Sequence, residues 1–181
     1  MTLFGWMRWK ALLAGLLLLS PLRLGPAEPP PDGSRAFEQL SSLVGEWEGK
    51  FEDGRTHRVA YRMTAGGAVL VETWALAPGR ESMTLYHRDG DTLLADHYCP
   101  QGNTPRLELA KVDADGKIFF KLRDGTNLQV PGKSHQQAFW LKFKGPDAYA
   151  RSETYVGNVS ADADMAADAA ITYTRVAAPA P

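Results

Sequence analysis

The sequence predicts an all-β fold: an antiparallel up-and-down barrel of about eight to ten strands with a short N-terminal helix. From Gly45 onward, apolar and polar residues alternate with a period of two, the spacing of strands with one buried face. Turn signals such as Asp-Gly and Pro-Gly separate these runs at short intervals, without room for crossover helices. Such a sheet is expected to close on itself, because closure removes its unpaired edges.

The first 27 residues have the pattern of a secretory signal peptide. Arg8 and Lys10 form a basic start, and the apolar run ALLAGLLLLS follows. This run is shorter than the roughly 20 apolar residues of a membrane-spanning helix, although an uncleaved anchor is the alternative. Gly25 and Ala27 favour cleavage after Ala27. The sequence therefore predicts an exported protein, periplasmic or secreted, with no membrane span after cleavage.

Residues 28–34, EPPPDGS, are expected to form a proline-rich disordered spacer, and residues 177–181 a disordered tail. Between them, residues 35–176 form one barrel domain. The 181 residues carry a net charge of −1, which gives no basic surface for nucleic acid. No nucleotide fingerprint, catalytic triad motif or clustered metal motif is present, so no cofactor is expected.

The expected helix begins with Ser34 as a candidate N-cap and ends before Gly45. Phe37, Leu40 and Leu43 follow at helical spacing and form its apolar face. Two longer irregular segments, 124–137 and 156–169, are candidates for loops at a barrel mouth. The ten expected strands are residues 46–52, 55–64, 68–76, 81–88, 92–99, 106–112, 117–123, 138–144, 149–155 and 170–176.

Two stretches resemble known proteins. LVGEWEG, with Gly45 and Trp47, is similar to the Gly-x-Trp signature of the calycins, the lipocalin and fatty-acid-binding-protein superfamily. The resemblance implies that Trp47 closes one barrel end and packs against Arg175 from the last strand, so that Gly45, Trp47 and Arg175 form a structural latch. Residues 83–107 are similar to a motif of uncharacterised exported bacterial lipocalin-like proteins, which implies a bacterial periplasmic or secreted location.

The chain departs from the calycin pattern in two ways. It has a single cysteine, Cys99, so it cannot form the paired lipocalin disulfides. It also lacks a recognisable Arg-x-Tyr clamp for a fatty-acid carboxylate. Cys99 is then a buried thiol, a reactive thiol or an intermolecular link, and a buried thiol is the commonest of these.

The densest group of reactive side chains is LLADHYCPQGNTPRL, residues 93–107. A three-residue turn at residues 89–91 would put His87 and His97 on one face about 13 Å apart, too far for one metal ion. His97 and Cys99 would share a face, but the strand spacing separates them by more than hydrogen-bond reach.

Asn103 is expected to stabilise a rigid turn between the two prolines, and Arg106 to lie on the surface. In the alternative, Arg106 faces the cavity and binds a carboxylate, with His97, Tyr98 or Asn103 completing a polar anchor.

Glu72 shares its face with Leu70 and Trp74, inside an otherwise apolar strand. An acid there must be paired, protonated or in contact with water. Arg62, Glu72, Arg151 and Glu153 form either an interior polar network or exposed cross-strand pairs.

The sequence therefore favours an exported barrel that binds a small, mainly apolar or amphipathic molecule, with ligand-binding candidates His97, Tyr98, Asn103, Arg106 and Glu72. No catalytic or metal-binding residue is assigned. The alternatives are a small barrel enzyme that uses His97 or Glu72 for acid-base chemistry, and an assembly accessory protein with a filled barrel and no ligand.

Overall fold

The computed structural model describes residues 31–51, 54–157 and 170–177. The expected signal peptide, the first three residues of the expected spacer, the segment 158–169 and residues 178–181 of the expected tail lie outside the described residues. No helix within the described ranges is long and apolar enough to cross a membrane.

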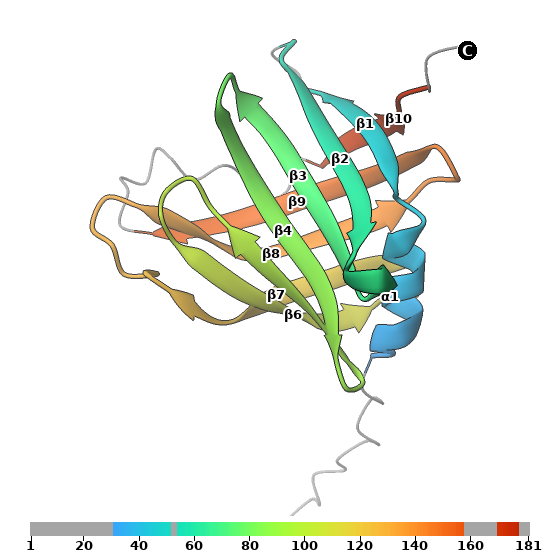
Figure 1. Ribbon diagram of the computed structural model, residues 1–181, viewed down its shortest axis with the longest axis horizontal. Helices are drawn as coiled ribbons and strands as arrows, with labels where there is room; N and C mark the ends of the chain where they lie inside the picture. The colour runs from blue at the N-terminus through green and yellow to red at the C-terminus, as the bar shows by residue number, and fades with distance from the viewer. Residues whose placement is uncertain (1–30, 52–53, 158–169, 178–181) are drawn as a thin grey trace, which may run out of the picture.

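Ten antiparallel strands form a closed barrel in which each strand pairs with its neighbours in sequence, and the last strand pairs with the first (Figure 1). The predicted fold class is therefore confirmed. The strands are β1 (Gly45–Lys50), β2 (Thr56–Thr64), β3 (Val69–Ala77), β4 (Arg80–Asp89), β5 (Thr92–Tyr98), β6 (Thr104–Val112), β7 (Lys117–Thr126), β8 (Ser134–Phe143), β9 (Ala148–Gly157) and β10 (Ile171–Arg175), with a short 3-10 turn η1 (Ala65–Gly67) between β2 and β3.

The single α-helix among the described residues, α1, spans Gly33–Ser41. Its N-cap is Asp32, whose carboxylate accepts a hydrogen bond from the Arg35 backbone N–H at 3.0 Å, and not Ser34. The last residues of the expected spacer therefore belong to the helix. The Gly33 N–H donates to the Asp91 carbonyl at 3.2 Å, which attaches α1 to the β4–β5 turn at one end of the barrel (Figure 1).

The β4–β5 hairpin corrects one expectation. Asp89 pairs with Thr92, so the turn contains two residues, with Gly90 at φ 61°, where three were expected. Because side chains alternate along a strand, shortening the turn by one residue reverses which side chains of β5 share a face with a given side chain of β4. His97 is buried inside the barrel and pairs with Thr84, whereas His87 lies on the outer face beside Asp96.

The expected loop at residues 124–137 is also shorter in the structure. β7 continues to Thr126, which pairs with Thr104 of β6, and β8 begins at Ser134, which pairs with Gly157 of β9. These extensions are polar, so apolar alternation could not reveal them. Backbone pairing with the neighbouring strands holds them in the sheet.

The barrel closes where β1 meets β10. Trp47 and Arg175 are paired in register, and the Arg175 guanidinium lies 4.2 Å from the centre of the Trp47 ring. Arg175 also donates to the carbonyls of Val44 and Ser42, at 2.8 and 3.0 Å. Gly45 has φ 132°, and a Cβ there would lie 2.7 Å from Arg175 Nη1. The contact expected from the calycin resemblance is present.

Apolar side chains fill the end of the barrel next to α1. The helix contributes Leu40, and the inner faces of the strands contribute large residues. Those that are almost fully buried include Leu43, Trp47, Leu70, Tyr86, Leu93, Leu107, Phe120, Phe139 and Tyr149. This half of the barrel is a packed core, so a ligand site has to be sought in the other half.

Candidate ligand-binding cavity

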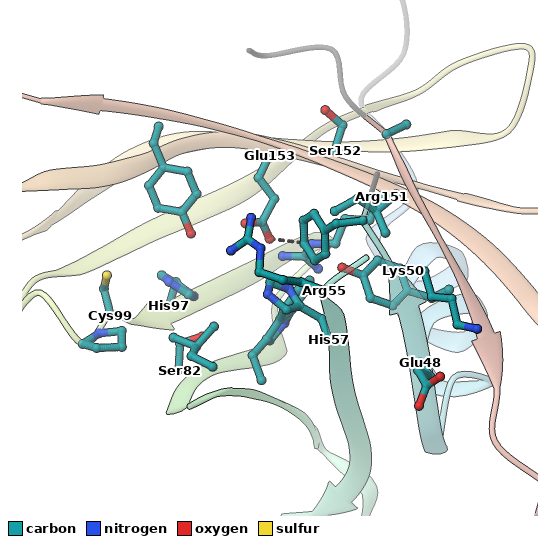
Figure 2. A pocket seen from close by; sticks show the side chains of 18 of the residues that line it. Glu48, Lys50, Arg55, His57, Ser82, His97, Cys99, Arg151, Ser152 and Glu153 are labelled. Atoms are coloured by element: carbon teal, nitrogen blue, oxygen red, sulfur yellow. Dashed lines mark hydrogen bonds and ion pairs between the residues drawn. The ribbon is translucent and has the colours of Figure 1, made fainter. Parts of the chain in front are cut away.

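The opposite end of the barrel is hollow. A cavity of about 1330 Å³ opens there, where the β1–β2, β3–β4 and β5–β6 turns meet. Its lining mixes apolar side chains, such as Trp74 and Ile171, with polar ones, such as Ser82 and His97. Figure 2 shows His97 and Cys99 at the left of the cavity, with Arg151 and Glu153 on β9 facing the same space. A concave site with a few convergent polar groups is typical of small-molecule binding.

The strand lengths explain where the wall opens. β10 pairs with β9 only along Ala148–Arg151. Beyond Arg151, β9 has β8 on one side and, among the described strands, no partner on the other. Arg151 and Glu153 therefore sit at the point where the closed wall gives way to the cavity.

A buried carboxylate underlies the inner end of the cavity. Glu72 on β3 is fully buried and accepts hydrogen bonds from the Trp74 indole N–H, from the Tyr86 hydroxyl at 2.5 Å and from Arg151 Nη1 at 2.9 Å. These donors replace the water that the carboxylate loses on folding. Glu72 is therefore paired and hydrogen-bonded inside the barrel, which is one of the three states expected for an acid on this otherwise apolar strand.

Arg151 connects this carboxylate to the cavity. Its Nε donates to Glu153 Oε1 at 2.7 Å, and its guanidinium contacts the rings of Trp74 and Phe139, 5.0 and 4.4 Å from their centres. Burial alone would lower the pKa of Arg151, but the neighbouring carboxylate of Glu72 and the other acidic groups outweigh it, and the pKa lies above its usual range. Its Nη2 is buried and has no hydrogen-bond acceptor among the described residues.

His97 on β5 lines the cavity on the other side. Its Nδ1 lies 3.0 Å from the Thr84 hydroxyl, and the residue is only 3% exposed. Burial lowers the pKa of His97 from its ordinary value of 6.5, against the opposing effect of Glu153 and Glu72. The imidazole is therefore neutral at pH 7 and offers hydrogen bonds without a charge.

The phenols of the interior are also neutral. Burial, followed by the field of Glu72, raises the pKa of Tyr61, Tyr86 and Tyr149 well above the usual value. For Tyr155, which lines the cavity, burial and then Glu153 have the same effect.

The structure brings only some of the predicted ligand-binding residues to the cavity. His97 lines it, and Glu72 lies beneath it. Tyr98 is 48% exposed and is not part of the lining, and Arg106 pairs with Asp124 on the outer surface. Arg62 is likewise exposed and stands apart from the interior network.

Asn103 has a structural place in the β5–β6 turn. Its Nδ2 donates to the Ser134 carbonyl at 2.9 Å, and the Gln101 side chain exchanges two further hydrogen bonds with Ser134. The amide side chains of this turn therefore fix it against the start of β8, on the rim of the cavity.

The residues that the binding prediction missed are Arg151 and Glu153. A signal for them exists in β9, where Tyr149, Arg151, Glu153 and Tyr155 alternate on one face. The two tyrosines indicate a buried face, and the charged residues between them share it. Only closure of the barrel shows that this face meets Glu72, which lies 79 positions earlier in the sequence.

Cys99 lines the cavity close to His97 but is a poor nucleophile. Burial raises the pKa of its thiol, so the reactive thiolate is scarce at pH 7. Within the described ranges, no three metal-ligating side chains of the His, Cys, Asp or Glu type gather in a metal-binding group.

No protein-family model matches the chain, and a search of curated proteins finds no match either. The closed antiparallel barrel with a helix at one end is compatible with a calycin fold.

Proposed function

We propose that this chain is an exported bacterial lipocalin-like protein that binds a small, mainly apolar molecule in the open half of its barrel. The observation that carries the proposal is the contrast between the two ends. One end is filled by large buried side chains, whereas the other holds a cavity of about 1330 Å³. A barrel whose role required only a stable surface would gain by filling both ends.

The lining suits an amphipathic ligand. Trp74, Leu76 and Ile171 supply apolar surface, while His97 and Glu153 supply hydrogen-bonding groups near the inner end. The apolar contacts provide affinity and the few polar groups fix the orientation. The ligand then enters through the mouth with its polar group first.

Native mass spectrometry tests this function directly. The full chain, purified from a bacterial host without denaturation, is expected to retain a small molecule or to take up the neutral apolar dye N-phenyl-1-naphthylamine. In the Ser82→Phe variant a ring fills part of the cavity, and dye affinity should fall by about tenfold or more.

The matched control is Met83→Phe. Met83 is next in sequence, but its side chain points to the opposite face of β4. This variant should bind the dye as the unmodified chain does. Equal binding by both variants, or an unmodified chain that neither retains a small molecule nor takes up the dye, would refute a ligand-binding barrel.

Export is tested by the mass of the mature protein. Cleavage after Ala27, as the N-terminal pattern predicts, removes residues 1–27. Intact mass measurement of protein recovered from the periplasm or the medium should show this loss. Recovery of the uncleaved chain from the membrane fraction would favour an anchor instead.

One observation favours a second candidate, an acid-base enzyme of the same shape. The neutral imidazole of His97 is a proton acceptor inside a cavity, with its Nδ1 held by Thr84. If this candidate is correct, a molecule recovered with the protein should be converted to a product of different mass, and His97→Gln should stop the conversion. A recovered molecule that stays unchanged contradicts it.

A further inference from the structure

The outer surface of the barrel carries aromatic rings among lysines on the neighbouring strands β6, β7 and β8 (Figure 1). Core residues alternate with outward-facing ones on these strands, which places Phe119 of β7 and Trp140 of β8 on the outside. The two rings are paired in register and half-buried, with centres 6.5 Å apart. We call these rings, with the lysines around them, the lysine-aromatic face; its lysines are Lys111, Lys117, Lys142 and Lys144.

Two of these lysines are placed against each other. Lys117 of β7 and Lys142 of β8 are cross-strand partners, and like charges in that position destabilise a sheet. Lys117 Nζ lies 4.7 Å from the ring centre of Trp140, and Lys111 Nζ lies 4.8 Å from that of Phe119. The rings therefore hold ammonium groups at the surface. An arrangement that costs stability in the free protein is typical of a binding surface.

Carboxylates do not neutralise this face. None of its four lysines forms an ion pair with a described residue. Asp113 and Asp115 lie in the β6–β7 turn beside it, and the Asp113 carboxylate accepts a hydrogen bond from the Lys117 backbone N–H at 2.9 Å. Four lysines thus stand against two aspartates, although the whole chain has a net charge of −1.

The charges around the face are balanced. The neighbouring cations have acidic partners, which are Glu108 for Lys121, Asp124 for Arg106 and Arg123, and Asp147 for Arg175. Asp96 of β5 also lies opposite Arg106. As far as the structure describes them, the outer faces of β9 and β10 carry no acidic side chain. The excess positive charge on this side of the barrel is therefore concentrated at the lysine-aromatic face.

The shape and chemistry of the face favour a membrane surface as its partner. The face lies on the outside of a closed barrel, so it meets an extended anionic surface more readily than it encloses a small anion. Val112, 41% exposed, adds apolar surface beside Lys111, and tryptophan with lysine is typical of the headgroup layer of a bilayer. Single-stranded nucleic acid needs open ring faces for base stacking, whereas ammonium groups lie over both rings here.

From these observations we propose that the lysine-aromatic face binds the surface of an anionic phospholipid bilayer, with lipid phosphates at its lysines and Trp140 in the headgroup layer. A phosphate between Lys117 and Lys142 removes their repulsion and accepts hydrogen bonds from both. The interaction is peripheral, since only outward-facing side chains take part. It goes beyond ligand binding in the cavity, whose lining includes none of these residues.

Vesicle co-sedimentation tests the proposal on the protein recovered from its bacterial host. Vesicles of phosphatidylglycerol mixed with phosphatidylcholine provide an anionic surface, and vesicles of phosphatidylcholine alone provide a neutral one. At pH 7 and low salt, the protein should bind the anionic vesicles about tenfold or more tightly than the neutral ones. Added salt should weaken this binding, because it screens the charges.

Variants locate the effect. Lys117→Gln with Lys142→Gln should lower the affinity for anionic vesicles about tenfold or more, since each lysine near such a surface contributes about fivefold. The matched control, Arg62→Gln with Lys133→Gln, removes two exposed cations outside the face and should bind as the unmodified chain does. The N-terminal residues are the same in every variant, so the difference between variants reports the face alone.

Trp140 provides a second measurement. With brominated phosphatidylglycerol in the vesicles, the tryptophan fluorescence of the bound protein should be quenched, and Trp140→Phe should lose much of this quenching. Trp47 and Trp74 are buried inside the barrel, away from a surface that contacts the outer face. If the double lysine variant does not fold, this comparison and the lipid preference of the unmodified chain decide.

Three results would overturn the proposal. They are equal binding to anionic and neutral vesicles, equal affinity of the two double variants for anionic vesicles, and quenching that persists unchanged in Trp140→Phe. Tighter binding of a single-stranded thymidine oligonucleotide than of anionic vesicles, at equal phosphate concentration, would also overturn it and assign the face to nucleic acid. Dye uptake by the cavity is measured separately, so the proposed ligand binding stands or fails independently of these results.

Discussion

The ion pair between Glu72 and Arg151 is the least replaceable contact at the residue scale. Both side chains are at most 1% exposed, and Arg151 Nη1 donates a hydrogen bond to Glu72 Oε2 at 2.9 Å. Removal of one partner leaves a buried charge without compensation, so Arg151→Met should lower the free energy of unfolding by about 3–5 kcal/mol. Urea unfolding followed by tryptophan fluorescence measures this loss.

A surface pair provides the control. Arg106 and Asp124 are 49% and 43% exposed, so Arg106→Met should cost only about 0–1 kcal/mol. The double variant Glu72→Gln with Arg151→Met should lose less than the sum of its two single variants, because neither fully buried charge of this pair then remains without the other. Equal losses for the buried and the surface variant would show that the interior pair is solvated.

His97 gives stability a defined pH dependence. Its folded pKa lies below its ordinary value of 6.5, so in the window below pH 6.5 the unfolded state binds a proton that the folded state does not. The stability that the neutral His97 contributes is therefore fully present above pH 6.5. It decreases as the pH falls through this window, until the folded pKa of His97 is reached.

Replacement of the imidazole tests this dependence. In His97→Gln, the decrease in the free energy of unfolding between pH 7 and pH 5 should be smaller than in the unmodified chain, while the other histidines contribute equally to both. Urea titrations at several pH values measure the difference. An identical pH dependence would mean that His97 titrates as it does in water.

At the scale of elements, the closure of β1 on β10 depends on Trp47. Its indole N–H donates to the Leu43 carbonyl at 2.7 Å, its ring meets Tyr149 edge-on, and Arg175 covers it. Trp47→Ala should lower stability by about 3–5 kcal/mol through loss of this packing. Dye affinity per folded molecule should stay the same, because Trp47 is not part of the cavity lining.

Thermal unfolding and dye titration of this variant, at a temperature where it is folded, measure the two effects separately. Loss of dye binding at unchanged stability would show that Trp47 belongs to the ligand site and not to the latch with Gly45 and Arg175.

At the scale of the whole molecule, the barrel has a packed half and a hollow half, and mutations should divide accordingly. Leu107 is fully buried in the core, so Leu107→Ala leaves a cavity and should cost about 2–5 kcal/mol. Ile171 is only partly buried and already borders open space, so Ile171→Ala should cost less.

Ligand affinity should respond in the opposite order. Ile171→Ala removes apolar lining and should weaken dye binding, whereas Leu107→Ala should leave it unchanged. Denaturant unfolding and dye titration of the two variants check this division. If Leu107→Ala alone weakened binding, the ligand would occupy the end of the barrel that contacts α1.

Local patterns were sufficient to predict the elements of this fold. Alternation placed His57, Val59 and Tyr61 on one face of β2, and the turn residues separated all ten strands near their observed positions. Apolar alternation does not predict the structure where backbone pairing between strands, and not burial of side chains, holds a segment in the sheet. The polar ends of β7 and β8 predict a loop but form strand, and the β4–β5 turn is one residue shorter than the turn residues predict, which places His87 on the outer face.

The sequence by itself determined the all-β class and a barrel of about eight to ten strands, because period-two alternation and turn chemistry are local properties. The contact of Trp47 with Arg175 was implied by the calycin resemblance and not by these local patterns. Only the tertiary structure decided the candidate site. A strand pattern shows which residues share a face, but not which distant strands face one another across a closed barrel. Closure placed Glu72, His97, Arg151 and Glu153 around one inner end, and directed Tyr98 and Arg106 to the solvent.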